Sequence, residues 1–219
     1  MRCTLALLAI VLTPVLPRIA APAQAMNDTQ MQNFMQSDYY RGLITRALAA
    51  VPKAVFEQCP SLVSKGSRTT VLRSVSFGKD GFPNEGLWKQ SFPVSGCGND
   101  TVLNFYFSAG ADEKVNTTIG VPGTTRADII LQSDAIFYAQ AEAALVAKDC
   151  KSFIVRDSRF EAFGTAKPPK PDPGPGNAYR PWWETWTMIG CGHTIDVSVD
   201  FMPHKNGTQV LASAPVERQ

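Results

Sequence analysis

One pattern of aromatic, glycine and cysteine residues occurs twice in this chain, with the second copy 94 positions after the first. Apolar or aromatic residues recur at every second position, with one polar residue among them, and the pattern closes on Gly-Cys-Gly. The copies are Trp88, Gln90, Phe92, Val94, Gly96, Cys97, Gly98 and Trp182, Glu184, Trp186, Met188, Gly190, Cys191, Gly192. Because side chains two positions apart share one face of a strand, the pattern predicts two related units, each with an aromatic strand that ends at a cysteine.

The first 25 residues have the composition of a secretory signal peptide. A basic residue at Arg2 precedes an apolar run over 5–16, and small residues end in Ala23-Gln24-Ala25. The apolar run is too short to cross a bilayer as a stable helix. We expect cleavage before Met26, and a secreted or periplasmic product with no membrane insertion after signal cleavage.

The charge balance does not favour a nucleic-acid partner. The whole chain has 21 basic and 19 acidic residues. The signal peptide contains Arg2 and Arg18 and no acid, so the mature chain has 19 of each sign and is formally neutral. Nucleic-acid-binding proteins usually show a basic excess or a basic face. We therefore expect no nucleic-acid partner and no polybasic contact with a membrane.

Four cysteines remain once Cys3 leaves with the signal peptide. An even number of cysteines in an exported chain predicts two disulfides. Of the three possible pairings, the repeat favours those within each copy, Cys59 with Cys97 and Cys150 with Cys191. Loop-closure entropy gives each such disulfide a stabilisation of about 4 kcal/mol. No C-x-x-C motif is present, so a thioredoxin-type redox role is not indicated.

Hydrophobic periodicity predicts the same order of elements in both copies. Helices are expected over 28–34 and 37–51, and again from a capping box at Thr125 and Asp128 to near Cys150. Strands separated by short turns follow each helical part. The expected strands are 70–77, 87–94, 101–108, 117–121, 153–163, 182–189, 194–202 and 208–213. We predict an α+β fold of two tandem diverged repeats, each a helix followed by an antiparallel sheet and stapled by one disulfide.

The two copies differ on the outer face of one strand. In the second copy the apolar Ile195 to Phe201 positions alternate with polar ones that include Asp196 and Asp200, which predicts one wet side. In the first copy the matching outer positions include Asn104 and Tyr106 and are less polar. We expect that outer face to be covered by the N-terminal helices.

A proline-rich connection distinguishes the second copy from the first. The expected plan is a signal peptide over 1–25, a first repeat over 26–124, and a second repeat over 125–219 with a proline-rich loop at 167–176. So many prolines exclude a regular helix or strand and favour a semi-rigid surface loop. The alternative is a polyproline recognition segment that binds through Pro171 and Pro173.

Tryptophans form the second candidate binding surface. On a strand, Glu184 and Trp186 share one face and Trp183 lies on the other. The first interpretation is an aromatic core beside the disulfide, in which Glu184 needs hydrogen-bond partners. The alternative is an aromatic platform for a glycan or a peptide. The candidate binding residues are Trp183, Trp186, His193, Pro171 and Pro173.

Two histidines, His193 and His204, limit imidazole chemistry. His193 could act as a general base, but no serine lies in a G-x-S-x-G motif. Met188, Met202 and the two histidines include donors that suit copper, although their spacing matches no defined site. We therefore predict no catalytic residue, no metal ligand and no cofactor.

The pattern W-x-[QE]-x-[FW]-x-[VM]-x-x-C-G, followed by an alternating strand, resembles a W-x-E-x-W-x-V-x-x-C-G strand module found in uncharacterised exported bacterial proteins. The resemblance covers the tryptophan strand and the strand after it in each copy. It implies a location in the bacterial envelope and brings no activity and no catalytic residue.

These observations together predict a non-catalytic binding or interaction protein, periplasmic or secreted. Its partner would be an envelope protein or a glycan, bound through Trp183, the proline-rich loop or the groove between the repeats. The first alternative is an envelope-polymer hydrolase with His193 or a carboxylate as its base. The second is a periplasmic copper-handling protein.

Overall fold

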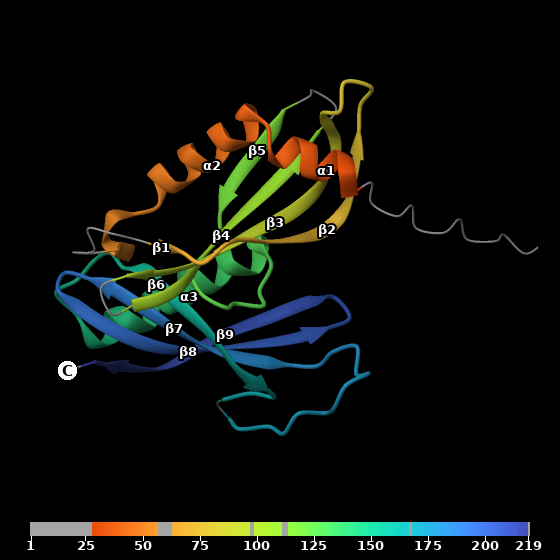
Figure 1. Cartoon of the computed structure of the whole chain (residues 1–219). Helices are drawn as coiled ribbons and strands as arrows, with labels where there is room; N and C mark the ends of the chain where they lie inside the picture. Colours follow the sequence, from red (N-terminus) through yellow and green to blue (C-terminus); the bar gives the residue numbers. More distant parts are fainter. Residues whose placement is uncertain (1–27, 57–62, 97–98, 111–113, 167, 219) are drawn as a thin grey trace, which may run out of the picture.

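The computed structural model describes residues 28–56, 63–96, 99–110, 114–166 and 168–218. It shows an α+β protein with two antiparallel sheets (Figure 1). The first part of the chain forms α1 (Asp28–Met35), α2 (Asp38–Ala50), the 3-10 helix η1 (Lys53–Phe56), β1 (Val63–Ser64), β2 (Arg68–Phe77), β3 (Pro83–Gly96), β4 (Asn99–Ala109) and β5 (Val115–Ile119). The second part forms α3 (Ile129–Val146), β6 (Ile154–Phe163), β7 (Trp182–Gly190), β8 (His193–His204) and β9 (Gly207–Glu217).

The first sheet has β3 and β4 at its centre, with β5 beside β4 and with β1 and β2 both paired to β3. Helices α1 and α2 lie across one face of this sheet (Figure 1). Phe34 and Tyr40 from these helices contact the rings of Trp88 and Phe107 on the strands. Trp88 lies opposite Phe107 in the ladder, and their rings stack at 5.5 Å between centroids. Large side chains therefore join the helices to the first sheet.

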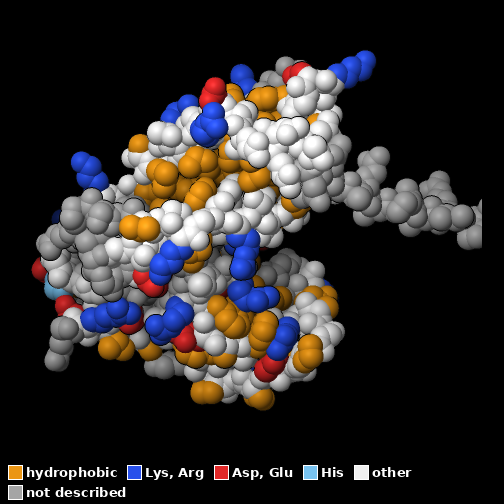
Figure 2. Space-filling model, in the orientation of Figure 1, with side chains coloured by type: hydrophobic (Ala, Val, Ile, Leu, Met, Phe, Trp, Pro, Cys, Tyr) orange, Lys and Arg blue, Asp and Glu red, His pale blue; other side chains and the backbone are white. Residues whose placement is uncertain are grey.

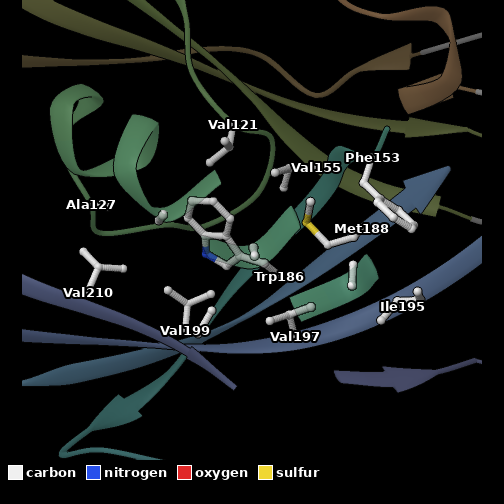
Figure 3. Packing of buried hydrophobic residues seen from close by; sticks show 14 of the residues in the cluster. Val121, Ala127, Phe153, Val155, Trp186, Met188, Ile195, Val197, Val199 and Val210 are labelled. Atoms are coloured by element: carbon white, nitrogen blue, oxygen red, sulfur yellow. The ribbon is translucent and has the colours of Figure 1, made fainter. Parts of the chain in front are cut away.

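The second sheet has the simple order β6-β7-β8-β9, and α3 packs against it. Figure 3 shows Trp186, Met188, Val197 and Val199 in the core between the sheet and the helix. The apolar positions of β8 are fully buried, as their alternation predicts. Helix α3 contributes mainly alanines to this core, at positions 135, 139 and 143.

Asp128 alone caps the N-terminus of α3. Its carboxylate accepts hydrogen bonds from the backbone N–H groups of Ile130 and Leu131, each at 2.9 Å. The expected capping box with Thr125 is wrong, because the Thr125 hydroxyl accepts from the N–H of Ala127 before the helix begins. Helix α3 ends at Val146, and a short turn leads to the cysteine that was expected at its end.

The disulfide between Cys150 and Cys191 is confirmed, with 5.6 Å between the two Cα atoms. It joins the segment after α3 to the tight turn between β7 and β8. Gly190 is required beside it, because a Cβ there would lie 2.3 Å from the carbonyl oxygen of Ser152. The other expected pair, Cys59 with Cys97, lies outside the described residues.

One short segment, residues 120–125, links the two sheets by backbone hydrogen bonds. The N–H of Gly123 donates to the carbonyl of Val102 on β4 at 2.7 Å, and the N–H of Thr124 donates to the carbonyl of Ser158 on β6 at 2.6 Å. The side-chain amide of Asn104 donates to the carbonyl of Gly123 at 3.0 Å. The segment thus continues along β4 and then passes to the second sheet.

Side chains reinforce this junction. The Ser158 hydroxyl donates to the carbonyl of Pro122 at 2.6 Å, and the Thr101 hydroxyl donates to Asp157 at 2.7 Å. Burial is the main influence on the Asp157 carboxyl and raises its pKa. Gly123 has a φ of 103°, and a Cβ there would lie 2.0 Å from the Ser158 carbonyl oxygen. The two backbones can approach this closely only at a glycine.

Two expectations about the outer faces are wrong. The N-terminal helices cover the Trp88 face of the first sheet, whereas α3 covers the opposite face through Gln132, whose amide donates to the Tyr106 hydroxyl at 2.9 Å. Asp200, expected on a wet face, is 1% exposed and accepts the N–H of Ala166 at 2.5 Å. In both cases a segment distant in sequence covers the strand.

Candidate binding site

A cleft of about 490 Å³ lies between the first sheet, α3 and the start of the second sheet. The end of α2 and η1 form one wall, β4 and β5 a second, and α3 with β6 a third. Its apolar walls include Val51, Val55, Phe105, Ile119, Ile136 and Phe153. None of the described residues that line the cleft is charged. Its size and lining are those of a site for an apolar group.

The amide side chains in the cleft are held by the protein itself. Gln132 accepts from the N–H of Val121 at 2.9 Å and donates to the carbonyl of Ala127 at 2.8 Å. Gln140 donates to the carbonyl of Phe153 at 2.7 Å. These amides therefore fix the walls in place. They add little polar recognition, so the cleft favours an apolar ligand over a glycan.

Strand β5 forms one edge of this cleft and also one edge of its sheet. Among the described strands, β5 pairs with β4 alone. Thr118 and Ile119, at the end of β5, line the cleft. A sheet edge of this kind can accept an added strand, since its outward N–H and C=O groups are not used by a neighbouring strand. An apolar cleft beside a sheet edge suits an extended peptide.

Trp186 lies in the core and not on a surface. Its side chain has no exposed area, so a ligand cannot contact it without unfolding the sheet. Its indole N–H donates to Glu184 at 2.8 Å, and the Trp182 indole donates to the same carboxylate at 2.9 Å. The N–H of Arg126 supplies a third bond, at 2.8 Å. Glu184 is thus fully buried and accepts hydrogen bonds from three donors. A buried glutamate at this position was expected to need such partners.

Gln90 occupies the matching position of the first sheet and is neutral. It accepts a hydrogen bond from the Tyr40 hydroxyl and donates to the Ser67 hydroxyl at 3.0 Å. Burial raises the pKa of Tyr40 well above its usual value. The hydroxyl therefore stays protonated and keeps donating throughout the ordinary pH range.

Trp183 lies on the opposite face of β7 and is half-buried. It pairs in the ladder with Ala162 and Asp200. Its neighbour Trp182 is also half-buried and stacks on Phe201 at 4.9 Å between ring centroids. The two rings therefore lie on opposite sides of one strand, and they do not form a continuous platform.

The proline-rich loop is held at its base and exposes Pro171 and Pro173. The Arg180 guanidinium lies 3.2 Å from the centroid of the Phe163 ring and donates from Nε to Asp172 at 2.7 Å. This hydrogen bond lowers the pKa of Asp172 to about 2. The loop is thus anchored to β6 through Arg180, while Pro171 and Pro173 stay exposed.

His193 lies between two carboxylates at the disulfide turn. Its Nδ1 is 2.6 Å from Glu217 and its Nε2 is 3.2 Å from Asp149. Hydrogen bonds to these two groups raise the pKa of His193. A raised pKa favours the imidazolium form, which cannot accept a proton as a general base would. The geometry is that of an ion-paired clamp between the C-terminal strand and the segment after α3.

Copper donors are not gathered in the described part of the chain. Met188 is fully buried in the core, and the Nδ1 atom of His204 accepts the N–H of Asn206 at 3.3 Å. Among the described residues, no group of three or more His, Cys, Asp or Glu side chains is placed to hold a metal ion. The carboxylates around His193 contact opposite ring nitrogens, so they do not converge on one point.

Charges of both signs are mixed on the face shown in Figure 2, where basic side chains lie beside acidic ones. Lys65 pairs with Asp100 at 3.2 Å, and Arg159 pairs with Glu161 at 2.7 Å. Within the described residues, no helix is long and apolar enough to cross a membrane.

The sequence suggested a groove between the two halves but did not indicate which residues line it. The apolar cleft residues come from six separate elements, so no local pattern marks them as a set. Comparisons of the chain with protein families, with curated proteins and with solved structures find no match. The cleft itself is therefore the basis for a functional proposal.

Proposed function

We propose that this protein is an exported, non-catalytic binding protein of the bacterial envelope, and that its partner inserts an extended apolar segment into the cleft between the two sheets. The observation that carries this proposal is the cleft of about 490 Å³, which has apolar walls and no charged lining among the described residues. Catalysis of hydrolysis needs a nucleophile or a base in such a site. The amides in the cleft have structural partners instead.

An envelope protein is favoured over a glycan as the partner. A glycan needs polar groups that converge on its hydroxyls, and the cleft offers few. An extended peptide can pair with the edge of β5 near Ile119 and place alternate side chains toward Ile119 and Ile136. The disulfide at Cys150 supports an oxidising compartment such as the periplasm or the medium.

We further propose that the two halves are diverged copies of one helix-plus-sheet unit. The ladders support this idea, because Trp88 lies opposite Phe107 and Trp182 lies opposite Phe201, and both ring pairs stack. Every one of these positions keeps the 94-residue offset of the sequence pattern. In this view the cleft arose where the two units meet.

A peptide library displayed on phage tests the binding proposal. Ser133 is exposed and lines the cleft, so Ser133→Trp fills the space with little effect on folding. Ala141→Trp, on the exposed face of the same helix and away from the cleft lining, is the matched control. We expect peptides with alternating apolar residues to bind the wild type and the control but not Ser133→Trp. Failure to enrich such peptides, or equal binding to all three proteins, would contradict the proposal.

A further inference from the structure

A second, smaller pocket lies at the start of β6, next to the inter-sheet cleft. It has a volume of about 290 Å³ and is lined by the first residues of β6 and by the turn that joins β7 to β8. We call it the Arg156 pocket, and its lining residues are 152, 154, 156 and 189–194. Ordinary ligand pockets begin at about 300 Å³. The Arg156 pocket therefore suits one end of a ligand better than a whole ligand.

Arg156 is a half-buried cation without a partner. Within the described part of the chain, its guanidinium forms no ion pair, no side-chain hydrogen bond and no contact with an aromatic ring. Arg180 is the other half-buried arginine among the described residues, and it donates to Asp172 at 2.7 Å. Partial removal of a cation from water without an acceptor costs free energy. An anion bound beside Arg156 would offset that cost.

Neutral hydrogen-bond donors line the same pocket. Ser152 and Thr194 contribute hydroxyl groups, and neither hydroxyl is hydrogen-bonded within the described residues. Cys191 and Gly192 form the turn, both with a left-handed backbone, at φ values of 51° and 86°. Their N–H groups take part in none of the described hydrogen bonds outside the strand ladders. A guanidinium together with hydroxyl and backbone N–H donors is a lining suited to a carboxylate.

The charges around the pocket favour a carboxylate over a phosphate. His193 also lines the pocket, but its ring already contacts the carboxylates of Glu217 and Asp149. These two carboxylates would repel a doubly charged phosphate, whereas Arg156 alone balances the single charge of a carboxylate. The planar guanidinium can also donate to both carboxylate oxygens at once.

The Arg156 pocket adjoins the inter-sheet cleft. Ile154 lines both of them. Arg156 follows two positions later on β6, which is about 7 Å along a strand. Two residues of an extended peptide span the same distance, so a peptide in the cleft can place its end beside Arg156. The cleft has no charged lining among the described residues, and Arg156 supplies the charge recognition that the cleft lacks.

We propose that the Arg156 pocket binds the free C-terminal carboxylate of the partner, through the guanidinium of Arg156. This inference rests on the proposed function, because it gives the extended apolar segment in the cleft an end and a direction. Ile154 and Ile189 line the same pocket and favour an apolar last residue. The partner is then an envelope protein whose chain ends in an extended, apolar C-terminal tail.

Fluorescence anisotropy with the peptides selected from the phage library tests this proposal. Each peptide is synthesised in two forms, one with a free C-terminal carboxylate and one with a C-terminal amide. We expect the wild type to bind the carboxylate form roughly tenfold more tightly, and Arg156→Gln to bind both forms equally. Arg73→Gln, at an exposed arginine of β2, is the matched control and should keep the preference. Circular dichroism should show the same unfolding temperature for Arg156→Gln as for the wild type, because the guanidinium has no described partner to lose.

The outcomes separate this inference from the proposed function. Equal binding of the two forms by the wild type overturns the carboxylate site and leaves the cleft as the peptide site. A preference that persists in Arg156→Gln also overturns it, because the carboxylate then binds elsewhere. An amidated peptide with aspartate as its last residue that binds as tightly as the carboxylate form shows recognition of a side chain, and the C-terminal assignment is wrong. If no peptide is selected at all, the proposed function fails and the carboxylate site fails with it.

Discussion

In both halves of the molecule a helix packs over a similar pair of aromatic strands. The helices of the first half do so with large side chains, and the helix of the second half does so with small ones. In the first half, α1 and α2 insert large side chains such as Phe34, Tyr40 and Leu43 against Trp88. In the second half, α3 inserts alanines and turns its large residues outward. A pair of aromatic strands of this kind therefore does not determine the size of the helix side chains that pack over it. The helix that supplies the smaller residues leaves its larger apolar residues exposed.

The largest expected difference between the halves concerns their buried polar residues. Glu184→Ala leaves two indole N–H groups and one backbone N–H without an acceptor, whereas Gln90→Ala leaves mainly the Tyr40 hydroxyl. We expect losses of unfolding free energy of about 4 kcal/mol for Glu184→Ala and about 1.5 kcal/mol for Gln90→Ala. Guanidinium unfolding of both variants measures this difference. Equal losses would show that the charged position holds its sheet no more strongly than the neutral one.

The same Leu→Ala truncation in α2 and in α3 tests whether the large side chains of each helix pack in a core. Leu43→Ala removes a buried side chain of α2 and should cost about 3 kcal/mol. Leu145→Ala removes an exposed side chain of α3 and should cost less than about 0.5 kcal/mol. Urea unfolding of the two variants compares these losses. A large loss for Leu145→Ala would place that residue in a core and remove the contrast.

The smallest expected effect is a pH dependence confined to the second half. Because Glu217 and Asp149 raise the folded-state pKa of His193, their stabilisation is complete below about pH 6.5 and is lost as the pH rises through the folded-state pKa. The wild type should therefore lose a little stability between about pH 5.5 and about pH 8.5 relative to His193→Gln. Its matching position in the first half is Asn99, which does not titrate. An identical pH profile for His193→Gln would show that the ion pairs of His193 do not contribute to stability.

Local patterns predicted the strands because alternation fixes which side chains face the core. The Ile195 to Phe201 positions were expected to be buried on one face, and they are. The two-residue strand β1 was missed, since it is too short to show any alternation. The Cys150–Cys191 pairing followed from the repeat, because the repeat supplied the partner that spacing alone does not.

The covered faces and the cleft could not be predicted in the same way. Asp200 alternates with apolar neighbours and was expected to face solvent, but the backbone N–H of Ala166, in the segment after β6, donates a hydrogen bond to it. Tyr106 is covered by Gln132 from α3, a contact that no periodicity encodes. Apolar residues are spread around all sides of α3, so its pattern did not reveal which side faces the sheet. To predict that the alanines face inward, one would need to know how closely α3 approaches the second sheet.

The linking segment at Gly123 also limits how this chain can change length. Inserting one residue between Ile119 and Gly123 would bring a side chain to the point where a Cβ lies only 2.0 Å from the Ser158 carbonyl oxygen. It would also shift the hydrogen bonds that continue along β4. Insertions and deletions should therefore be tolerated in the exposed part of the proline-rich loop but not at this crossing. The path of the chain between β5 and α3 is fixed here by the backbone itself.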